Sequence, residues 1–172
     1  MTMSLDDIEQ LLAPWQSAYG DSAILSTSVT ALHLIGMLVA GGLAIAADRA
    51  TLRISEEAPG QREWHLGELN AIHRPVLLAM SLLLITGLAM IAADVKTFIT
   101  SPVLWVKLTL VALLVINGVV LERTETALRR TETSGPAASS EKLWSRLRVS
   151  AICSIAVWVA TLVAGVVLVN AA

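Results

Sequence analysis

The sequence predicts an all-α fold: an integral membrane four-helix bundle with both termini outside the cytoplasm and a short N-terminal interfacial helix. Hydrophobic residues make up 55% of the 172 residues and charged residues 15%, whereas soluble domains are roughly half apolar and roughly a quarter charged. The mean hydropathy is +0.71. The apolar residues are gathered into four long blocks, which indicates that the lipid bilayer is their solvent.

The segment before the first apolar block predicts a helix that lies along the membrane interface. Ser4, Asp6 and Asp7 are typical of a helix N-terminus. Apolar residues then recur at helical spacing, at Ile8, Leu11, Leu12 and Trp15. We therefore expect an interfacial helix over residues 4–15. The segment contains no Lys or Arg, unlike a secretory signal peptide, so we expect it to be retained.

Each apolar block is long enough to cross a membrane. A hydrocarbon core of about 30 Å needs about 20 apolar residues in a helix. The predicted spans are residues 23–47, 71–93, 103–121 and 149–169. The connection between the second and third spans is short and ends in Ser101-Pro102, a typical helix start, so we expect these two spans to be antiparallel neighbours.

Positive charges predict the orientation, because short connections rich in Lys and Arg stay in the cytoplasm. The two connections that carry them hold Arg49, Arg53, Arg62 and Arg74, and Arg123, Arg129, Arg130, Lys142, Arg146 and Arg148. The N-terminal segment and residues 170–172 have no basic residue, so both termini are expected outside the cytoplasm. Within the second basic connection, the small and polar residues 133–140 predict a flexible linker.

Each span has one face of small and polar residues. In lipid, helices associate through such faces, while large aliphatic side chains turn to the acyl chains. On the first span this face comprises Ser26, Thr30, His33, Met37, Ala40 and Ala44. We predict that the four faces meet in one interior, although the small residues Gly36, Ala40 and Gly41 also suit contacts with a membrane-protein partner or a second copy of the chain.

Charged residues at the span ends predict two structural polar pairs. Lys107 lies about one helical turn inside the third span, where a charge is costly unless it is paired. Asp94, at the outer end of the preceding span, is its expected partner. Asp48, at the inner end of the first span, is expected to meet Arg74 or His73. Proton or substrate handling by Lys107 is the alternative to pairing.

His33 is the most informative residue, because it lies near the middle of the first span. A neutral imidazole there needs a partner. One interpretation is a functional histidine, and the other is a histidine that hydrogen-bonds to a Ser or Thr of a neighbouring helix. Met37 lies one turn away on the same face, and Met80 lies at a similar depth in the second span. Imidazole and thioether donors suit Cu(I), so His33, Met37 and Met80 form a candidate copper site, with ordinary core packing as the alternative.

Haem is the second cofactor that the histidines suggest. Four-helix membrane bundles hold b-type haem between histidines on facing helices, which makes His33 and His73 the obvious pair. Their predicted depths differ by roughly 15 to 20 Å, whereas two axial ligands of one iron lie only about 4 Å apart. We therefore expect a haem to use one of these two residues with another ligand.

Five short segments carry a family resemblance. They are His33-Leu34-Ile35-Gly36, Asp48-Arg49, Thr86-Gly87, Ser101-Pro102-Val103-Leu104-Trp105-Val106-Lys107 and Asn117-Gly118. Over residues 30–121 the chain resembles uncharacterised bacterial four-span membrane proteins that are distantly similar to the membrane domain of the copper resistance protein D family. The resemblance implies a bacterial inner-membrane location and copper handling or haem-linked redox chemistry, with His33 and Lys107 at recurring positions. The sequence has neither the additional spans of that protein nor a Met-rich outer loop, so we do not expect transport.

Three classes of function remain: a copper-linked membrane protein, a b-type haem electron-transfer subunit, and a cofactor-free structural subunit of a membrane complex. No Ser-His-Asp set, phosphate loop or Cys-rich metal motif occurs in the sequence, which disfavours a hydrolase or a nucleotide-driven pump. The expected partners are the lipid bilayer and a membrane protein or a second copy of the chain. Nothing suggests nucleic acid, because the basic residues are explained by topology.

Overall fold

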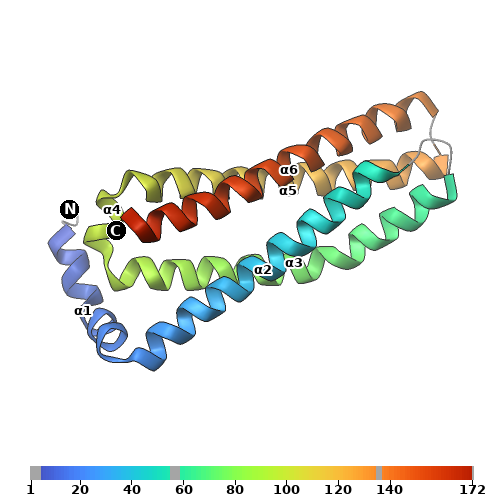
Figure 1. Ribbon diagram of the computed structural model, residues 1–172. Coiled ribbons are helices and arrows are strands. Elements are labelled where there is room, and N and C mark those ends of the chain that lie inside the picture. The colour runs from blue at the N-terminus through green and yellow to red at the C-terminus, as the bar shows by residue number, and fades with distance from the viewer. Residues whose placement is uncertain (1–4, 55–58, 135–136, 172) are drawn as a thin grey trace.

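The computed structural model describes residues 5–54, 59–134 and 137–171, and these residues form a bundle of helices (Figure 1). The helices are α1 (Leu5–Asp21), α2 (Ala23–Arg53), α3 (Pro59–Ala93), α4 (Val95–Thr100), α5 (Pro102–Ser134) and α6 (Ala137–Ala171). Four of them, α2, α3, α5 and α6, are long and apolar enough to cross a membrane. The predicted all-α membrane bundle of four helices is therefore confirmed.

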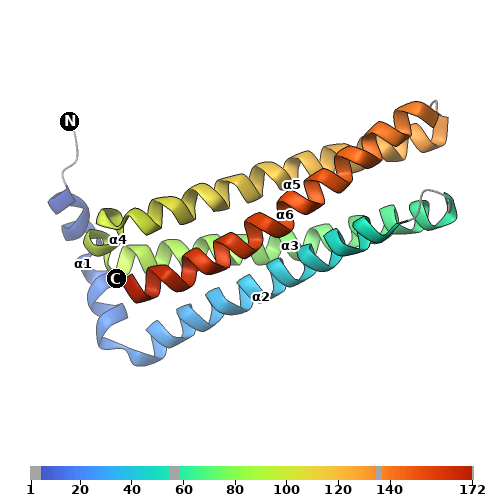
Figure 2. The same cartoon turned by 45° about the horizontal axis from the view of Figure 1, so that its top comes forward.

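The four long helices run antiparallel in one elongated bundle (Figures 1 and 2). The end that carries α1 and α4, which we call the terminal end, also holds the start of α2 and the end of α6. At the opposite end, which we call the loop end, α2 and α5 finish and α3 and α6 begin. Both ends of the chain thus lie on one side, as four crossings require. That this side faces outward stays a prediction.

The four long helices extend beyond the predicted spans, mainly at the loop end. They contain 31 to 35 residues, which corresponds to about 46–53 Å, against a hydrocarbon core of about 30 Å. Of the predicted linker 133–140, residues 135–136 lie outside the described residues, and the flanking residues belong to α5 and α6. At the loop end a buried apolar cluster joins the helices: Leu66, Leu69, Leu128, Trp144 and Leu147.

Arginines that indicate topology also hold the loop end together. Arg148 Nη2 donates a hydrogen bond to the Ile54 carbonyl at 2.9 Å, which satisfies a backbone oxygen just past the end of α2. Arg129 donates to the Leu66 carbonyl of α3. The Arg62 guanidinium lies 5.1 Å from the centre of the Trp144 ring, close enough for a cation–π contact. These three arginines of the two basic connections therefore belong to helices of the bundle.

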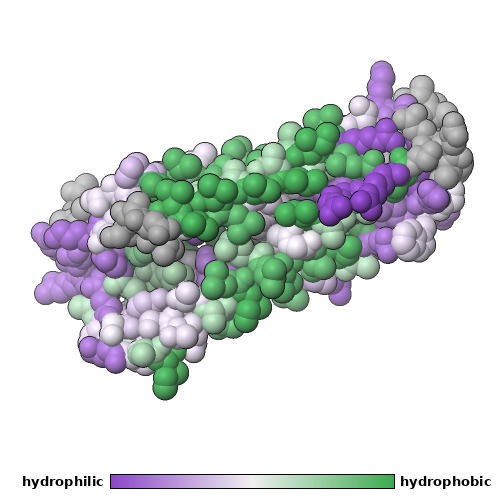
Figure 3. Space-filling model, viewed as in Figure 1, coloured by the Kyte–Doolittle hydropathy of each residue, from purple (hydrophilic) through white to green (hydrophobic). Residues whose placement is uncertain are grey.

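The face of the bundle seen in Figure 3 has an apolar middle zone and more polar ends. Large aliphatic residues cover the outside of the bundle, among them Ile24, Leu38 and Leu78, which are 82%, 76% and 73% exposed. The predicted inner faces are turned inward, as shown by Ala40 and Trp158, which are 0% and 4% exposed. This separation agrees with helices that pack through small and polar residues within lipid.

Gly36 and Gly41 of α2 are used inside the bundle. A Cβ atom at Gly36 would lie 3.2 Å from Leu83 of α3, and one at Gly41 would lie 3.2 Å from the Trp158 ring of α6. Ala40, between them, is fully buried. These small residues let α2 pack closely against α3 and α6, so they are not free to contact a second copy of the chain.

The contact between the second and third spans differs from the expectation. Helix α2 packs against both α3 and α6, and α5 packs against α6, whereas α3 and α5 touch little. The short helix α4 joins α3 to α5 and separates their ends at the terminal end (Figure 2). The two spans are antiparallel, as expected, but they do not pack side by side as neighbours, and two cavities are lined by residues of both helices.

Helix α1 covers the terminal end. It is longer than the predicted helix over residues 4–15, which begins in the part of the chain outside the described residues. Trp15 Nε1 donates to the Ala89 carbonyl at 2.9 Å, and Gln16 Nε2 donates to the Ala92 carbonyl at 3.4 Å. These bonds join α1 to backbone carbonyl groups in the last turns of α3. The position of α1 at a membrane interface stays a prediction.

Candidate functional site

The predicted copper ligands line a single cavity in the half of the bundle nearer the terminal end. This His33 cavity has a volume of about 130 Å³. Its polar and sulfur-containing lining residues are His33 and Met37 of α2, Met80 and Met90 of α3, Lys107 of α5 and Thr161 of α6. The remaining lining residues have mainly apolar side chains, apart from Gly87, which has no side chain. The structure therefore brings His33, Met37 and Met80 together, on two neighbouring helices.

His33 is held by a hydrogen bond between helices. Its Nδ1 atom lies 2.9 Å from Oγ1 of Thr86, and the Thr86 hydroxyl donates to the Leu82 carbonyl at 2.7 Å. A hydroxyl has one hydrogen, so Thr86 accepts the Nδ1 proton of the neutral ring. The Nε2 atom then carries the lone pair. His33 therefore makes the hydrogen bond to a Thr of a neighbouring helix that was one of its two interpretations. This bond is compatible with a ligand role, because metal-binding histidines usually donate their other N–H to a fixed partner.

Two glycines provide room for the ionisable side chains of the cavity. A Cβ atom at Gly87 of α3 would lie 3.3 Å from Cε1 of His33. A Cβ atom at Gly165 of α6 would lie 3.6 Å from the Lys107 ammonium nitrogen. Both glycines lie on the inner faces of their helices. The side chains of His33 and Lys107 occupy the space that a larger residue would need there.

The predicted pair of Asp94 and Lys107 does not form. Asp94 is the N-cap of α4, where its Oδ1 atom accepts a hydrogen bond from the Thr97 amide at 3.2 Å. Lys107 is turned into the His33 cavity instead. The physical reason is α4, which uses the carboxylate for its own first turn and keeps the start of α5 away from the end of α3.

The predicted pair of Asp48 with Arg74 or His73 does not form either. Asp48 is 4% exposed and lies beside Ser154 of α6. Arg74 is exposed on α3. The Nε2 atom of His73 lies 3.8 Å from Oε2 of Glu122 on α5. Asp48 faces the interior of the bundle and Arg74 faces outward, so the two side chains do not meet.

His33 and His73 lie too far apart to share a haem iron. Thr86, which contacts His33, is 13 residues beyond His73 on α3, and this corresponds to about 20 Å along the helix. The two histidines also line different cavities. The depth argument from the sequence agrees with this placement.

A second cavity, which was not predicted from the sequence, lies nearer the loop end. This cavity, which we call the vestibule, has a volume of about 340 Å³. Its polar lining residues include Asp48, His73, Asn117, Glu122, Glu125 and Ser154. Four residues line both cavities and stand between them, namely Met80, Leu84, Leu114 and Trp158, which we call the girdle. The signal that could have revealed the vestibule is the helical spacing of acidic residues where α5 continues past its predicted end.

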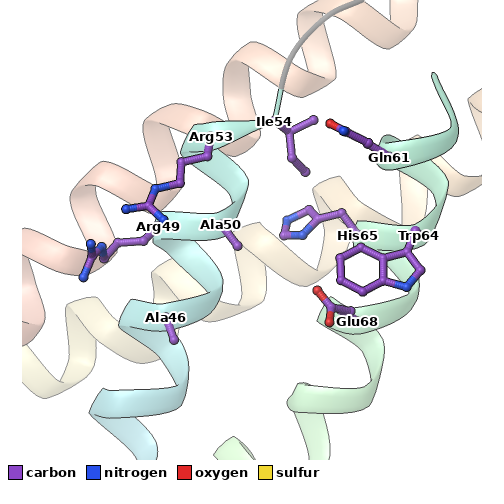
Figure 4. Close-up of a pocket in the computed structure, with 9 residues that line it drawn as sticks. All are labelled: Ala46, Arg49, Ala50, Arg53, Ile54, Gln61, Trp64, His65 and Glu68. Carbon is purple, nitrogen blue, oxygen red and sulfur yellow. The ribbon is translucent and has the colours of Figure 1, made fainter. Parts of the chain in front are cut away.

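A third cavity opens between α2 and α3 at the loop end (Figure 4) and has a volume of about 710 Å³. Arg49 and Arg53 of α2 extend away from α3, whereas His65 and Glu68 of α3 project toward α2. His65 Nε2 lies 2.8 Å from Oγ1 of Thr51, so this histidine joins the two helices. The cationic groups do not converge with the other polar groups of this cavity, so we assign it no ligand.

Within the described ranges, no group of three or more His, Cys, Asp and Glu side chains is arranged to hold a metal ion. Cys153 is exposed on the outer face of α6. A metal site in this part of the protein would therefore need the thioethers of the His33 cavity. Comparison of the chain with protein-family models, with curated proteins and with solved structures found no match.

Proposed function

We propose that this multi-pass membrane protein binds one Cu(I) ion in the His33 cavity, with Nε2 of His33 and the sulfur atoms of Met37 and Met80 as ligands. The observation that carries the proposal is that these three side chains line the same cavity while Nδ1 of His33 lies 2.9 Å from the Thr86 hydroxyl, which leaves Nε2 as the nitrogen that can bind a metal. One imidazole and two thioethers form a soft donor set that suits Cu(I) better than hard or borderline cations.

The size and charge of the cavity support a single monovalent ion. Sites for cofactor-sized molecules have volumes of roughly 300–1,000 Å³, whereas this cavity measures about 130 Å³. It is therefore too small for a haem unless the helices separate. Lys107 lines the same cavity, and its ammonium repels a divalent cation twice as strongly as a monovalent one at the same distance.

The proposed setting is the inner membrane of a bacterium, with the loop end in the cytoplasm. The support is the distribution of basic residues, because Arg-rich short connections are retained on the cytoplasmic side. The loop end carries the arginines of both connections, while the first turns of α1 are acidic.

Anaerobic titration of the detergent-purified protein with Cu(I), in competition with a chromophoric chelator, tests the proposal. We expect one Cu(I) per chain, loss of binding in His33→Ala and weaker binding in Met80→Leu. Met90→Leu is the matched control, because Met90 lines the same cavity but is not a proposed ligand. His73→Ala is a second control and should bind copper normally.

Visible spectra and elemental analysis of the same preparation separate the alternatives. A Soret band that shifts on reduction would show that the cofactor is a b-type haem and not copper. If the preparation contains no copper and shows no Soret band, and if His33→Ala and the unmodified protein give equal titrations, the protein is a structural subunit. His33 would then serve packing alone.

A further inference from the structure

Acidic side chains of the vestibule come from two helices, and one of them has a buried oxygen atom without a hydrogen-bond partner among the described residues. Arg129 Nη2 lies 2.9 Å from Glu125 Oε1, and His73 Nε2 lies 3.8 Å from Glu122 Oε2, so both glutamates face a basic group. Asp48 is 4% exposed, and its Oδ2 atom is buried without a hydrogen-bond partner among the described residues. The fold therefore leaves a buried acceptor on the vestibule wall.

The polar groups that interrupt the mostly apolar wall of the vestibule favour water in it. A carboxylate in a membrane-spanning helix is costly unless it is paired or faces a water-filled space. The cavity of about 340 Å³ has room for several water molecules, each of which occupies about 30 Å³ in the liquid. Ser154 offers a further hydrogen-bonding group, whereas Asn117 already bonds to Ser150 of α6. Acyl chains would leave the Oδ2 atom of Asp48 unsatisfied.

The vestibule adjoins the His33 cavity across the girdle. Gly41 of α2 packs against the girdle residue Trp158, and Asp48 is seven residues further along α2, which corresponds to about 10 Å toward the loop end. Met80, a proposed copper ligand, lines both cavities. Met80 thus contacts both the vestibule and the His33 cavity.

We propose that the vestibule is a water-filled access route for cations from the loop end, with Asp48 as the residue that makes it selective for positive charge. A carboxylate is a poor ligand for a soft ion such as Cu(I), so Asp48 acts through its field, by raising the local concentration of cations and their rate of arrival. The identity of the cation as Cu(I) rests on the proposed function, whereas the charge selectivity of the vestibule does not.

Thiol-reactive probes of opposite charge measure this selectivity without any metal. In a Cys153→Ser background, Gly118→Cys places a thiol at the exposed rim of the vestibule, where an added Cβ meets nothing within 4 Å. The detergent-purified protein is treated with a methanethiosulfonate that carries either a trimethylammonium or a sulfonate group. The reaction rate with the cationic reagent is divided by the rate with the anionic reagent, and this ratio is divided by the same ratio for a free thiol. We expect a ratio well above one, which falls by about tenfold in Asp48→Asn.

Matched variants show whether the effect belongs to the vestibule. Glu63→Gln removes the same charge from an exposed position of α3 near the loop end and should leave the ratio unchanged. Glu122→Gln, on the vestibule wall with a side chain that is 56% exposed, should lower it less than Asp48→Asn, and it provides the test if Asp48→Asn does not fold. An introduced thiol that reacts with neither probe would overturn the proposal. So would a ratio that a folded Asp48→Asn leaves unchanged or, if that variant does not fold, a ratio that Glu122→Gln leaves unchanged.

The kinetics of copper loading test the link to the His33 cavity. Asp48→Asn should slow the binding of Cu(I) by about tenfold and leave the affinity at equilibrium within about twofold, because Asp48 is not a ligand. An equal loss of rate and affinity would contradict a purely electrostatic role. If the unmodified protein binds no copper, the proposed function fails, and the charge ratio still decides whether the vestibule admits cations.

Discussion

The Nδ1 atom of His33 lies 2.9 Å from the Oγ1 atom of Thr86, and this contact joins α2 to α3 within the membrane-spanning part of the bundle. Because Thr86 uses its own hydrogen for the Leu82 carbonyl, it fixes the tautomer of the imidazole. His33 can therefore fill both roles considered from the sequence: Nδ1 bonds to the neighbouring helix, and Nε2 is left for a metal.

Thr86→Val removes the acceptor of the His33 proton while keeping the shape of the side chain. We expect the affinity for Cu(I) to fall by about 10- to 100-fold, as is typical when the fixed partner of a metal-binding histidine is lost. The stability should fall by only about 0.6 kcal/mol, the average for hydrogen bonds between membrane helices. Chelator competition and thermal unfolding in detergent measure the two effects. Thr86→Ser should bind like the unmodified protein, and normal binding by Thr86→Val would contradict the tautomer argument.

Gly87→Ala tests the space that the imidazole occupies. The added Cβ would lie 3.3 Å from Cε1 of His33, so the ring must move by a few tenths of an ångström away from α3. We expect weaker Cu(I) binding, by about tenfold. The matched control is Gly42→Ala on α2, where nothing lies within 4 Å of the added atom. That variant should keep its affinity and gain up to about 1 kcal/mol of stability, because Ala favours a helix over Gly.

Lys107→Leu tests the charge of the His33 cavity without adding a metal ligand. Two unit charges about 8 Å apart repel by about 2 kcal/mol at an effective dielectric constant of 20, so removal of the ammonium should tighten Cu(I) binding by about 30-fold. The discrimination against divalent ions should weaken at the same time. Titrations with Cu(I) and Zn(II) measure both changes. Weaker Cu(I) binding by this variant would mean that Lys107 supports the ion rather than opposing it.

The spans and the inner faces were predictable because lipid imposes a simple rule on each helix. An α-helix needs about 20 apolar residues to cross the membrane, and its small and polar residues turn to its neighbours. His33, Met37 and Met80 follow from that rule, since their spacing and depth place them on inner faces at one level. Their common cavity in the structure agrees with this.

The polar pairs and the vestibule were not predictable because they depend on helix lengths and on the gap between α3 and α5. The sequence does not show that Asp94 caps α4, and without α4 the pairing of Asp94 with Lys107 is the natural expectation. Likewise, Arg74 or His73 is the natural expectation for a partner of Asp48. Only the rotation of α2 turns the Asp48 carboxylate inward to Ser154. Charge pairing between helices is set by rotation and spacing, which hydropathy does not report.

Trp144→Ala tests the apolar cluster at the loop end. The Trp144 side chain is 1% exposed among Leu66, Leu69, Leu128 and Leu147. Because the helices exceed the hydrocarbon thickness, we expect this cluster to be stabilised by burial from water, a driving force that is absent within lipid. Truncation should lower the free energy of unfolding by about 3–5 kcal/mol, with loss of the Arg62 cation–π contact adding about 0.5–1 kcal/mol.

Trp64→Ala is the matched control for that variant, because Trp64 also lies at the loop end of α3 but is 66% exposed. Thermal unfolding in one detergent compares the two, and the His33 cavity should bind Cu(I) with unchanged affinity in both. An equal, small loss of stability in Trp64→Ala and Trp144→Ala would show that the loop end is held by its arginine hydrogen bonds rather than by the apolar cluster. A large loss confined to Trp144→Ala would establish a water-driven core outside the lipid, continuous with the lipid-embedded bundle.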